Sequence, residues 1–179
     1  MPTPTVPLRN EAPHRPMASR PGLRQVAVDL LTPLGWLSGT LHVPSHLPLG
    51  EHLALGTHDL KLTGVTVPNE PDRLRFLALR RDAVVVVAPA LAEEGEEPAS
   101  DYTTAREVAC LLPTGMLRGT LRVFSNLRLS DHLQQQGHLI TLRYCLLAPY
   151  GATANSPGAR ALHTAIVNLD HAMGISEGA

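Results

Sequence analysis

Apolar and polar residues alternate along two stretches of the chain, 36–43 and 116–123. A period of two is typical of a β-strand with one buried side and one solvent-facing side. Each stretch follows a short apolar run that ends in proline and glycine, which favours a hairpin. The pattern therefore predicts one β-hairpin near the start of each half of the chain.

The two hairpins belong to an internal repeat, which determines how the rest of the chain is interpreted. Residues 31–62 align without a gap to residues 111–142, an offset of 80, and 15 of these 32 positions are identical. A weaker similarity relates residues 74–82 to residues 162–170 at an offset of 88. We interpret the chain as an internal duplication of one module.

Each hairpin is followed by one helix and two more strands at matching positions. Residues 49–55 and 129–135 have the spacing of one or two helical turns. The run Val84–Val87 is β-branched throughout, which favours a buried strand. The predicted fold class is α+β, mostly β, with two tandem β-β-α-β-β modules and antiparallel sheets. The later strands are expected over 59–67 and 75–88 in the first module, and over 139–147 and 161–169 in the second.

Composition divides the chain into four parts. Residues 1–22 hold prolines and arginines without an apolar period, which indicates a disordered arm. Module 1 is expected over 23–90 and module 2 over 104–176. Residues 91–103 contain four glutamates and form the expected acidic linker. Because a lone module of this size is marginally stable, we expect the two modules to pack together or to dimerise.

The overall charge and hydropathy narrow the class of protein. Hydrophobic residues make up 44% of the chain and aromatic residues only 3%, so the core is expected to be aliphatic. A net charge of −1 provides no global field for nucleic acid or an anionic membrane. We find neither a secretory signal nor an apolar run long enough for a membrane span, and expect a cytoplasmic protein. The preference for arginine over lysine indicates a bacterial origin.

The segment 119–123 followed by 127–133 resembles a family of short, uncharacterised bacterial domains. The family pattern is G-x-L-x-x-P, then R-L-S-D-x-L, and finally F-x-A-x-x-R-x-x-V. Module 2 supplies the R-L-S-D element, and Phe124 replaces its proline. The resemblance covers most of both modules and implies no activity, cofactor or functional residue. Module 1 supplies Pro44, Phe76, Ala78, Arg81 and Val84 of the pattern.

Four histidines are the candidate metal ligands. His52 and His58 recur as His132 and His138, with the same spacing in both modules. Imidazoles bind Zn²⁺ when several converge with a carboxylate, which Glu51 or Asp131 would supply. The alternative is that these histidines are surface or turn residues inherited with the duplication, because a spacing of six does not align side chains on one helical face.

Four arginines on one predicted strand are the candidate nucleic-acid contacts. Arg73, Arg75, Arg80 and Arg81 form the densest basic cluster and could contact phosphate. Module 2 lacks counterparts, and arginines on an edge strand also protect it against pairing with another sheet. We therefore expect nucleic-acid binding to be weak or absent.

Cysteines and glycines at matched positions are interpreted as structural. Cys110 and Cys145 align with the aliphatic Leu30 and Val65, so we expect small buried hydrophobes and not a disulfide. Gly39 and its repeat partner, Gly119, lie inside predicted strands, where a bulge or a close backbone approach requires glycine.

No nucleophile elbow, phosphate-binding loop or dinucleotide motif is present, and we predict no catalytic residues and no cofactor. The leading hypothesis is a non-catalytic adaptor or assembly protein that binds another protein or itself through exposed sheet edges. The alternatives are a metal- or small-ligand-binding module that uses the repeated histidines, and a weak nucleic-acid-binding protein.

Overall fold

The computed structural model describes residues 22–55, 58–91, 101–151 and 158–178. The predicted arm, apart from its last residue, and most of the predicted acidic linker lie outside the described residues. No helix in the described ranges is long and apolar enough to cross a membrane.

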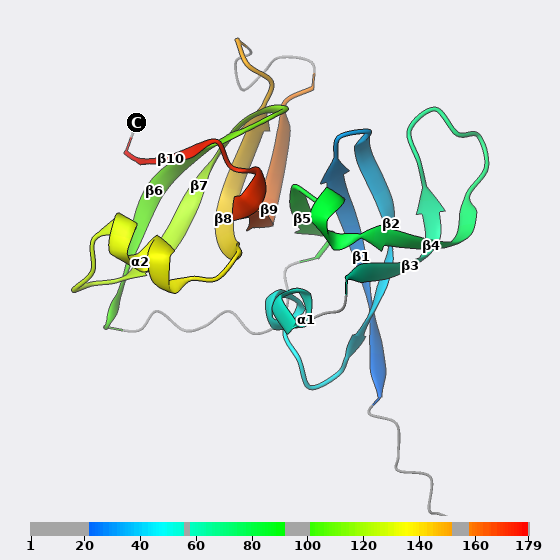
Figure 1. Ribbon diagram of the computed structural model, residues 1–179, viewed down its shortest axis with the longest axis horizontal. Helices are drawn as coiled ribbons and strands as arrows, with labels where there is room; N and C mark the ends of the chain where they lie inside the picture. Colours follow the sequence, from blue (N-terminus) through cyan, green and yellow to red (C-terminus); the bar gives the residue numbers. More distant parts are fainter. Residues whose placement is uncertain (1–21, 56–57, 92–100, 152–157, 179) are drawn as a thin grey trace, which may run out of the picture.

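The first half of the described chain contains five strands and one helix, which we call the first unit (Figure 1). A single 3-10 turn, η1, separates its last two strands. The elements are β1 (Leu23–Thr32), β2 (Gly35–Pro44), α1 (Leu49–Leu55), β3 (Asp59–Thr66), β4 (Leu74–Arg80), η1 (Arg81–Ala83) and β5 (Val86–Pro89).

The second half has the same order of elements, and we call it the second unit. Both predicted helices and both predicted hairpins are present in the two units. The elements are β6 (Thr103–Leu112), β7 (Gly115–Phe124), α2 (Leu129–Gln135), β8 (Leu139–Ala148), β9 (Arg160–Asn168), η2 (Leu169–His171) and β10 (Gly174–Glu177).

The ten strands form one mostly β, antiparallel assembly and not two separate sheets. Their order is β10-β6-β7-β8-β9-β5-β1-β2-β3-β4, so the sheet is continuous across the two units (Figure 1). The connection between the units is the pairing of β5 with β9, in which Val86 lies opposite Val167 and Val87 lies opposite Ile166.

The prediction of a single strand over 75–88 was wrong. The chain leaves β4 at Arg80, makes the turn Arg81–Ala83 and begins β5 at Val86. β4 pairs with β3, whereas β5 pairs with β1 on the other side of the unit. Each unit therefore has five strands, and the predicted four-strand pattern lacks the last one. The pattern of apolar and polar residues cannot reveal that the chain passes from one side of the unit to the other between β4 and β5. One long strand and two short strands give the same pattern.

Gly39 and Gly119 occupy bulges, as predicted. The register between β2 and β3, and between β7 and β8, shifts at these residues. A Cβ atom on Gly119 would lie 2.8 Å from Sγ of Cys145, which leaves no room for a side chain. Across each bulge the backbone turns into the left-handed region, at Gly64 (φ 60°) and at Tyr144 (φ 51°).

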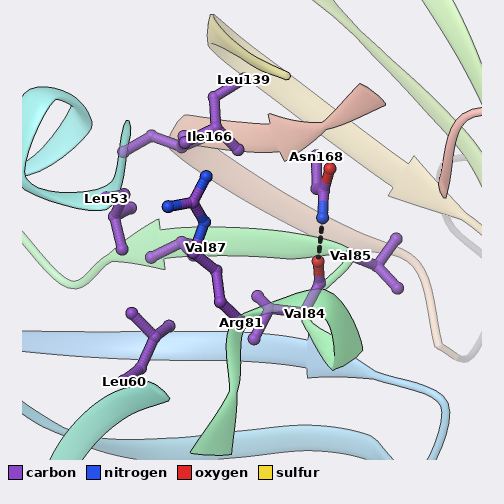
Figure 2. Close-up of a pocket in the computed structure, with 9 residues that line it drawn as sticks. All are labelled: Leu53, Leu60, Arg81, Val84, Val85, Val87, Leu139, Ile166 and Asn168. Carbon is purple, nitrogen blue, oxygen red and sulfur yellow. Dashed lines mark hydrogen bonds between the residues drawn. The ribbon is translucent and has the colours of Figure 1, made fainter. Parts of the chain in front are cut away.

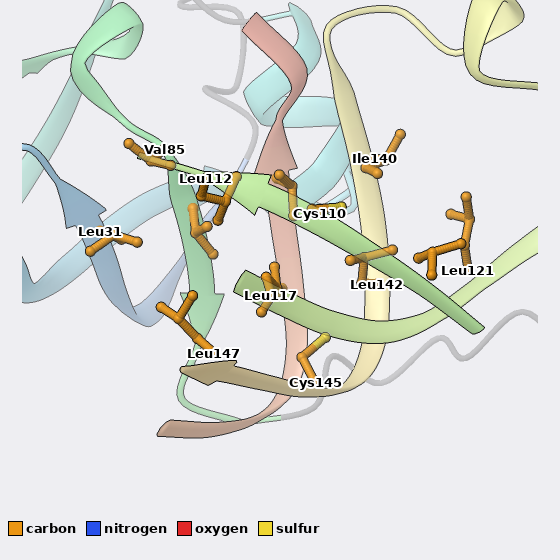
Figure 3. Packing of buried hydrophobic residues seen from close by; sticks show 14 of the residues in the cluster. Leu31, Val85, Cys110, Leu112, Leu117, Leu121, Ile140, Leu142, Cys145 and Leu147 are labelled. Carbon is orange, nitrogen blue, oxygen red and sulfur yellow. The ribbon is translucent and has the colours of Figure 1, made fainter. Parts of the chain in front are cut away.

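The apolar core is aliphatic, as predicted, and divides into two clusters that exchange residues at the junction of the units. Leu31, Val85 and Val86 of the first unit belong to the cluster formed by the second unit (Figure 3). Ile166 of the second unit belongs to the cluster of the first. The β5–β9 junction is therefore part of the core and not a contact between two separately closed domains.

Candidate functional site

Among the residues that the structure describes, the two ends of the sheet are open strands, β4 at one end and β10 at the other. Such edges expose unpaired backbone groups that can accept a further strand. The β4 and β10 edges are the candidate site. The pairing of β5 with β9 shows how two such edges pair within this chain.

The β4 edge presents apolar side chains together with backbone donors. Leu74 is 39% exposed and Phe76 is 57% exposed. The N–H of Arg81 donates to the carbonyl oxygen of His58 toward β3, at 2.9 Å. Because successive residues of a strand direct their N–H groups to opposite sides, the N–H groups of Ala78 and Arg80 point outward from the sheet.

Exposed apolar side chains also lie beside β10. Met173 is 66% exposed and Leu111, on the adjacent β6, is 37% exposed. The N–H of Gly178 donates to the carbonyl oxygen of Glu107 toward β6, at 3.0 Å. By the same alternation, the N–H of Ile175 points outward.

At the internal junction the corresponding edge groups are paired. The backbone N–H of Asn168 donates to the carbonyl oxygen of Val85 at 2.9 Å. Its side-chain amide donates to the carbonyl oxygen of Val84 at 3.2 Å (Figure 2). Figure 2 shows the small, mostly apolar pocket beside this contact, into which Leu53 of the first unit and Ile166 of the second unit project.

A polar cluster also joins the two units. The guanidinium group of Arg160 donates to the carboxylate of Asp29 and lies 4.3 Å from the ring centroid of Trp36. The hydroxyl of Ser38 donates to the other oxygen of Asp29 at 2.6 Å. The two units are thus joined by backbone pairing, by apolar packing and by an ion pair.

The four predicted histidine ligands lie in different surroundings. His132 is buried at 4% exposure, its Nδ1 has no hydrogen-bond partner, and burial lowers its pKa. Burial, and secondarily Arg24, lowers the pKa of the partly buried His52. His58 is exposed, and His138 donates to Asp170 at 2.9 Å.

The described residues contain no group of three or more histidine, cysteine, aspartate or glutamate side chains that could hold a metal ion. The structure therefore offers no support for a metal site formed by the repeated histidines.

Three of the four predicted arginines have separate hydrogen-bond partners within the chain. Arg80 donates two hydrogen bonds to Asp82, which lowers the pKa of that carboxyl group. Arg81 turns toward the helix and donates to the carbonyl oxygen of Ala54 at 3.3 Å. Arg73 donates to the Thr66 hydroxyl at 3.2 Å, and Arg75 is exposed on β4.

Both cysteines are buried free thiols, as predicted. Burial raises the pKa of Cys110 to about 11 and that of Cys145 to about 12. Both thiols are therefore protonated at neutral pH and are poor nucleophiles.

The apolar residues of the β10 edge were missed by the sequence analysis. The signal was available, because the offset of 88 that relates 74–82 to 162–170 continues to relate β5 to β10. The sequence analysis did not extend the alignment that far, because residues 83–89 and 171–177 have little sequence similarity.

The described chain is a mostly β protein with one antiparallel sheet and two open edges. Comparison with family models, with characterised proteins and with solved structures finds no match to this chain.

Proposed function

We propose that this chain is a non-catalytic assembly protein, produced by internal duplication, whose open sheet edges bind a polypeptide strand. One observation carries the proposal: within the described residues the sheet ends in two strands without a further partner, and exposed large apolar residues lie on β4 and beside β10. Soluble proteins usually protect such edges by covering them or by placing charges along them. Addition of a strand satisfies the backbone groups of an open edge and buries its apolar side chains.

The charges along the edges are only a partial protection. Arg80 is engaged by Asp82, and Glu177 on β10 is engaged by Arg106. Both pairs leave Phe76 and Met173 exposed, at 57% and 66%. The apolar residues of the edges are therefore accessible to a partner strand, and an isolated pair of exposed charges opposes binding only weakly.

The test uses a photo-reactive amino acid in place of Phe76, in the full chain expressed in its native cells. We expect a covalent adduct to a polypeptide, either a second copy or another protein. The Ala78→Pro substitution, which removes an outward N–H group from the same edge, is expected to abolish the adduct.

A photo-reactive group in place of Tyr144 is the matched control, because this residue is 69% exposed but lies on β8, inside the sheet. The proposal is wrong if Phe76 gives no adduct, or if its adduct persists unchanged in the Ala78→Pro variant.

A further inference from the structure

We infer that the strand bound at each edge comes from a second copy of this chain, so that β10 of one copy pairs with β4 of the next. The contact would repeat between copies the β5–β9 junction that already exists inside each copy. This inference rests on the proposed function and names the partner and the geometry of its binding.

The backbone on the β10 side is already arranged as it is at the internal junction. In the first unit the N–H of Val85 donates to the carbonyl oxygen of Leu31 at 2.9 Å, just before β5. In the second unit the N–H of Met173 donates to Leu111 at 2.8 Å, just before β10. β5 and β10 also pair in the same register with β1 and β6, so β10 presents to solvent the edge that β5 presents to β9.

The backbone on the β4 side is equivalent to that of β9. The N–H of Leu169 donates to the carbonyl oxygen of His138 at 2.8 Å after β9. The N–H of Arg81 donates to His58 at 2.9 Å after β4. The edge of β4 is therefore the counterpart of the edge with which β9 receives β5.

Side chains that are buried at the internal junction have exposed counterparts at the ends of the sheet. Leu31 and Val85 are 3% and 2% exposed, whereas the equivalent Leu111 and Met173 are 37% and 66% exposed. These counterparts remain large and apolar, although nothing in the described chain covers them. A second copy placed as in the internal junction would bury them as the second unit buries Leu31 and Val85.

The internal pairing also fixes the expected register. Val87 lies opposite Ile166, and the equivalent residues are Ile175 on β10 and Ala78 on β4. Both direct their N–H groups outward from the sheet. The pair Ile175–Ala78 is thus positioned to exchange backbone hydrogen bonds between two copies.

Charge favours this head-to-tail contact over a symmetric one. Two β4 strands placed side by side would put Arg75 and Arg80 of both copies along one contact, and like charges on paired strands repel. In the head-to-tail register, Glu177 of β10 lies opposite Phe76 of β4 and Met173 lies opposite Arg80, so no two charges of the same sign face each other. Two copies joined by one head-to-tail contact still have one open β4 edge and one open β10 edge, so the contact generates rings or extended chains of copies and not only dimers.

Several parts of the internal junction are not repeated. Asn168, whose side-chain amide donates to Val84, corresponds to Arg80, and the buried Val86 corresponds to Gly174. Asp29 and Arg160 correspond to Ala109 and Asp72, so the ion pair has no counterpart between copies. The contact between copies is therefore weaker than the internal one, and the assembly is expected to depend on protein concentration.

The experiment compares two proline variants by native mass spectrometry and light scattering. Ile175→Pro blocks the β10 edge and Ala78→Pro blocks the β4 edge, while the hydrogen bonds to the neighbouring strands of the same copy are retained. We expect the wild-type chain to form multiples of its 19.2 kDa mass. Each variant alone is expected to have the mass of one chain.

Mixing the two variants is the decisive step. Each retains the edge that the other lacks, so an equimolar mixture is expected to form a 1:1 heterodimer of twice 19.2 kDa that grows no further. Ile175→Val and Ala78→Ser retain the N–H groups and serve as matched controls that should still assemble. If a proline variant fails to fold by circular dichroism, Met173→Asp and Ala78→Asp replace the pair, because both positions are exposed.

A monomeric wild-type chain, assembly that survives both substitutions, or a mixture that forms no heterodimer would each overturn the inference. If the wild-type chain is monomeric but Phe76 still crosslinks to a different polypeptide through an open β4 edge, the proposed function stands and only the identity of the partner fails. If there is neither self-association nor an edge-dependent adduct, both proposals fail.

Discussion

At the scale of single residues, His132 is the residue in the described ranges whose buried side-chain nitrogen has no hydrogen-bond partner. Its imidazole is 4% exposed, packs edge-on against Phe124 at 6.0 Å between ring centroids, and leaves Nδ1 without a hydrogen bond. Burial disfavours the charged form, so the folded pKa of His132 lies below the ordinary value of 6.5.

This burial predicts an acid-sensitive fold. As the pH falls through about 6.5, the unfolded chain takes up a proton at His132 before the folded chain does, so stability is present above that pH and is lost below it. We expect His132→Leu to reduce the loss of unfolding free energy between about pH 7.5 and about pH 5. Urea denaturation at both pH values measures the effect.

The control for this prediction is His46→Gln, because His46 is exposed. It should leave the loss of stability with falling pH unchanged. Equal losses in the wild type and in His132→Leu would show that the buried imidazole is not the cause.

The sequence predicted some residue roles well and others poorly. Cys110, Cys145, Gly39 and Gly119 were assigned correctly, because alignment of the repeat compares each with a partner in an equivalent environment. The repeated histidines could not be resolved in this way. Sequence spacing does not reveal that His132 faces Phe124 while His138 faces Asp170.

At the scale of elements, the bulges constrain the two units unequally. A Cβ atom on Gly119 would meet Sγ of Cys145 at 2.8 Å, whereas one on Gly39 would meet the Val65 side chain at 3.2 Å. The first contact forces a displacement, and the second requires a shift of a few tenths of an ångström.

We therefore expect Gly119→Ala to destabilise the protein by about 1–3 kcal/mol, the range of overpacked cores, and Gly39→Ala to cost less. Chemical denaturation of both variants tests the order. Adding Cys145→Ala to Gly119→Ala should recover part of the loss, because the closest contact is removed. Equal costs for the two glycine substitutions would contradict this account.

The polarity pattern predicted the hairpins and helices but not the division between β4 and β5. The hairpins are defined by local alternation and by the turns between their strands, which a sequence displays directly. The turn Arg81–Ala83 has neither glycine nor proline, and Val84–Val87 continues the apolar run without interruption. Only the long-range pairing of β5 with β1 separates the two strands.

At the scale of the whole molecule, the junction between the units combines features that no local pattern contains. Asp29 and Arg160 are 131 residues apart in the chain and meet only because β5 pairs with β9. The single tryptophan, Trp36, lies under the Arg160 guanidinium group. Its fluorescence therefore reports on the junction, while circular dichroism reports on all strands.

The last prediction concerns the strength of that junction. A double-mutant cycle with Asp29→Ala and Arg160→Ala should give a coupling of about 1 kcal/mol, because both side chains are partly buried and Asp29 also accepts a hydrogen bond from Ser38. The Arg80–Asp82 pair is the matched control. Its side chains are 69% and 67% exposed, so its coupling should be smaller.

Because Leu31, Val85 and Val86 complete the core of the second unit, we expect wild-type unfolding followed by Trp36 fluorescence to coincide with unfolding followed by circular dichroism. If the two transitions separate in the wild type, the units unfold independently and the shared core does not couple them. If they coincide in the wild type and separate in the double variant, the ion pair contributes to holding the two units in one cooperative structure.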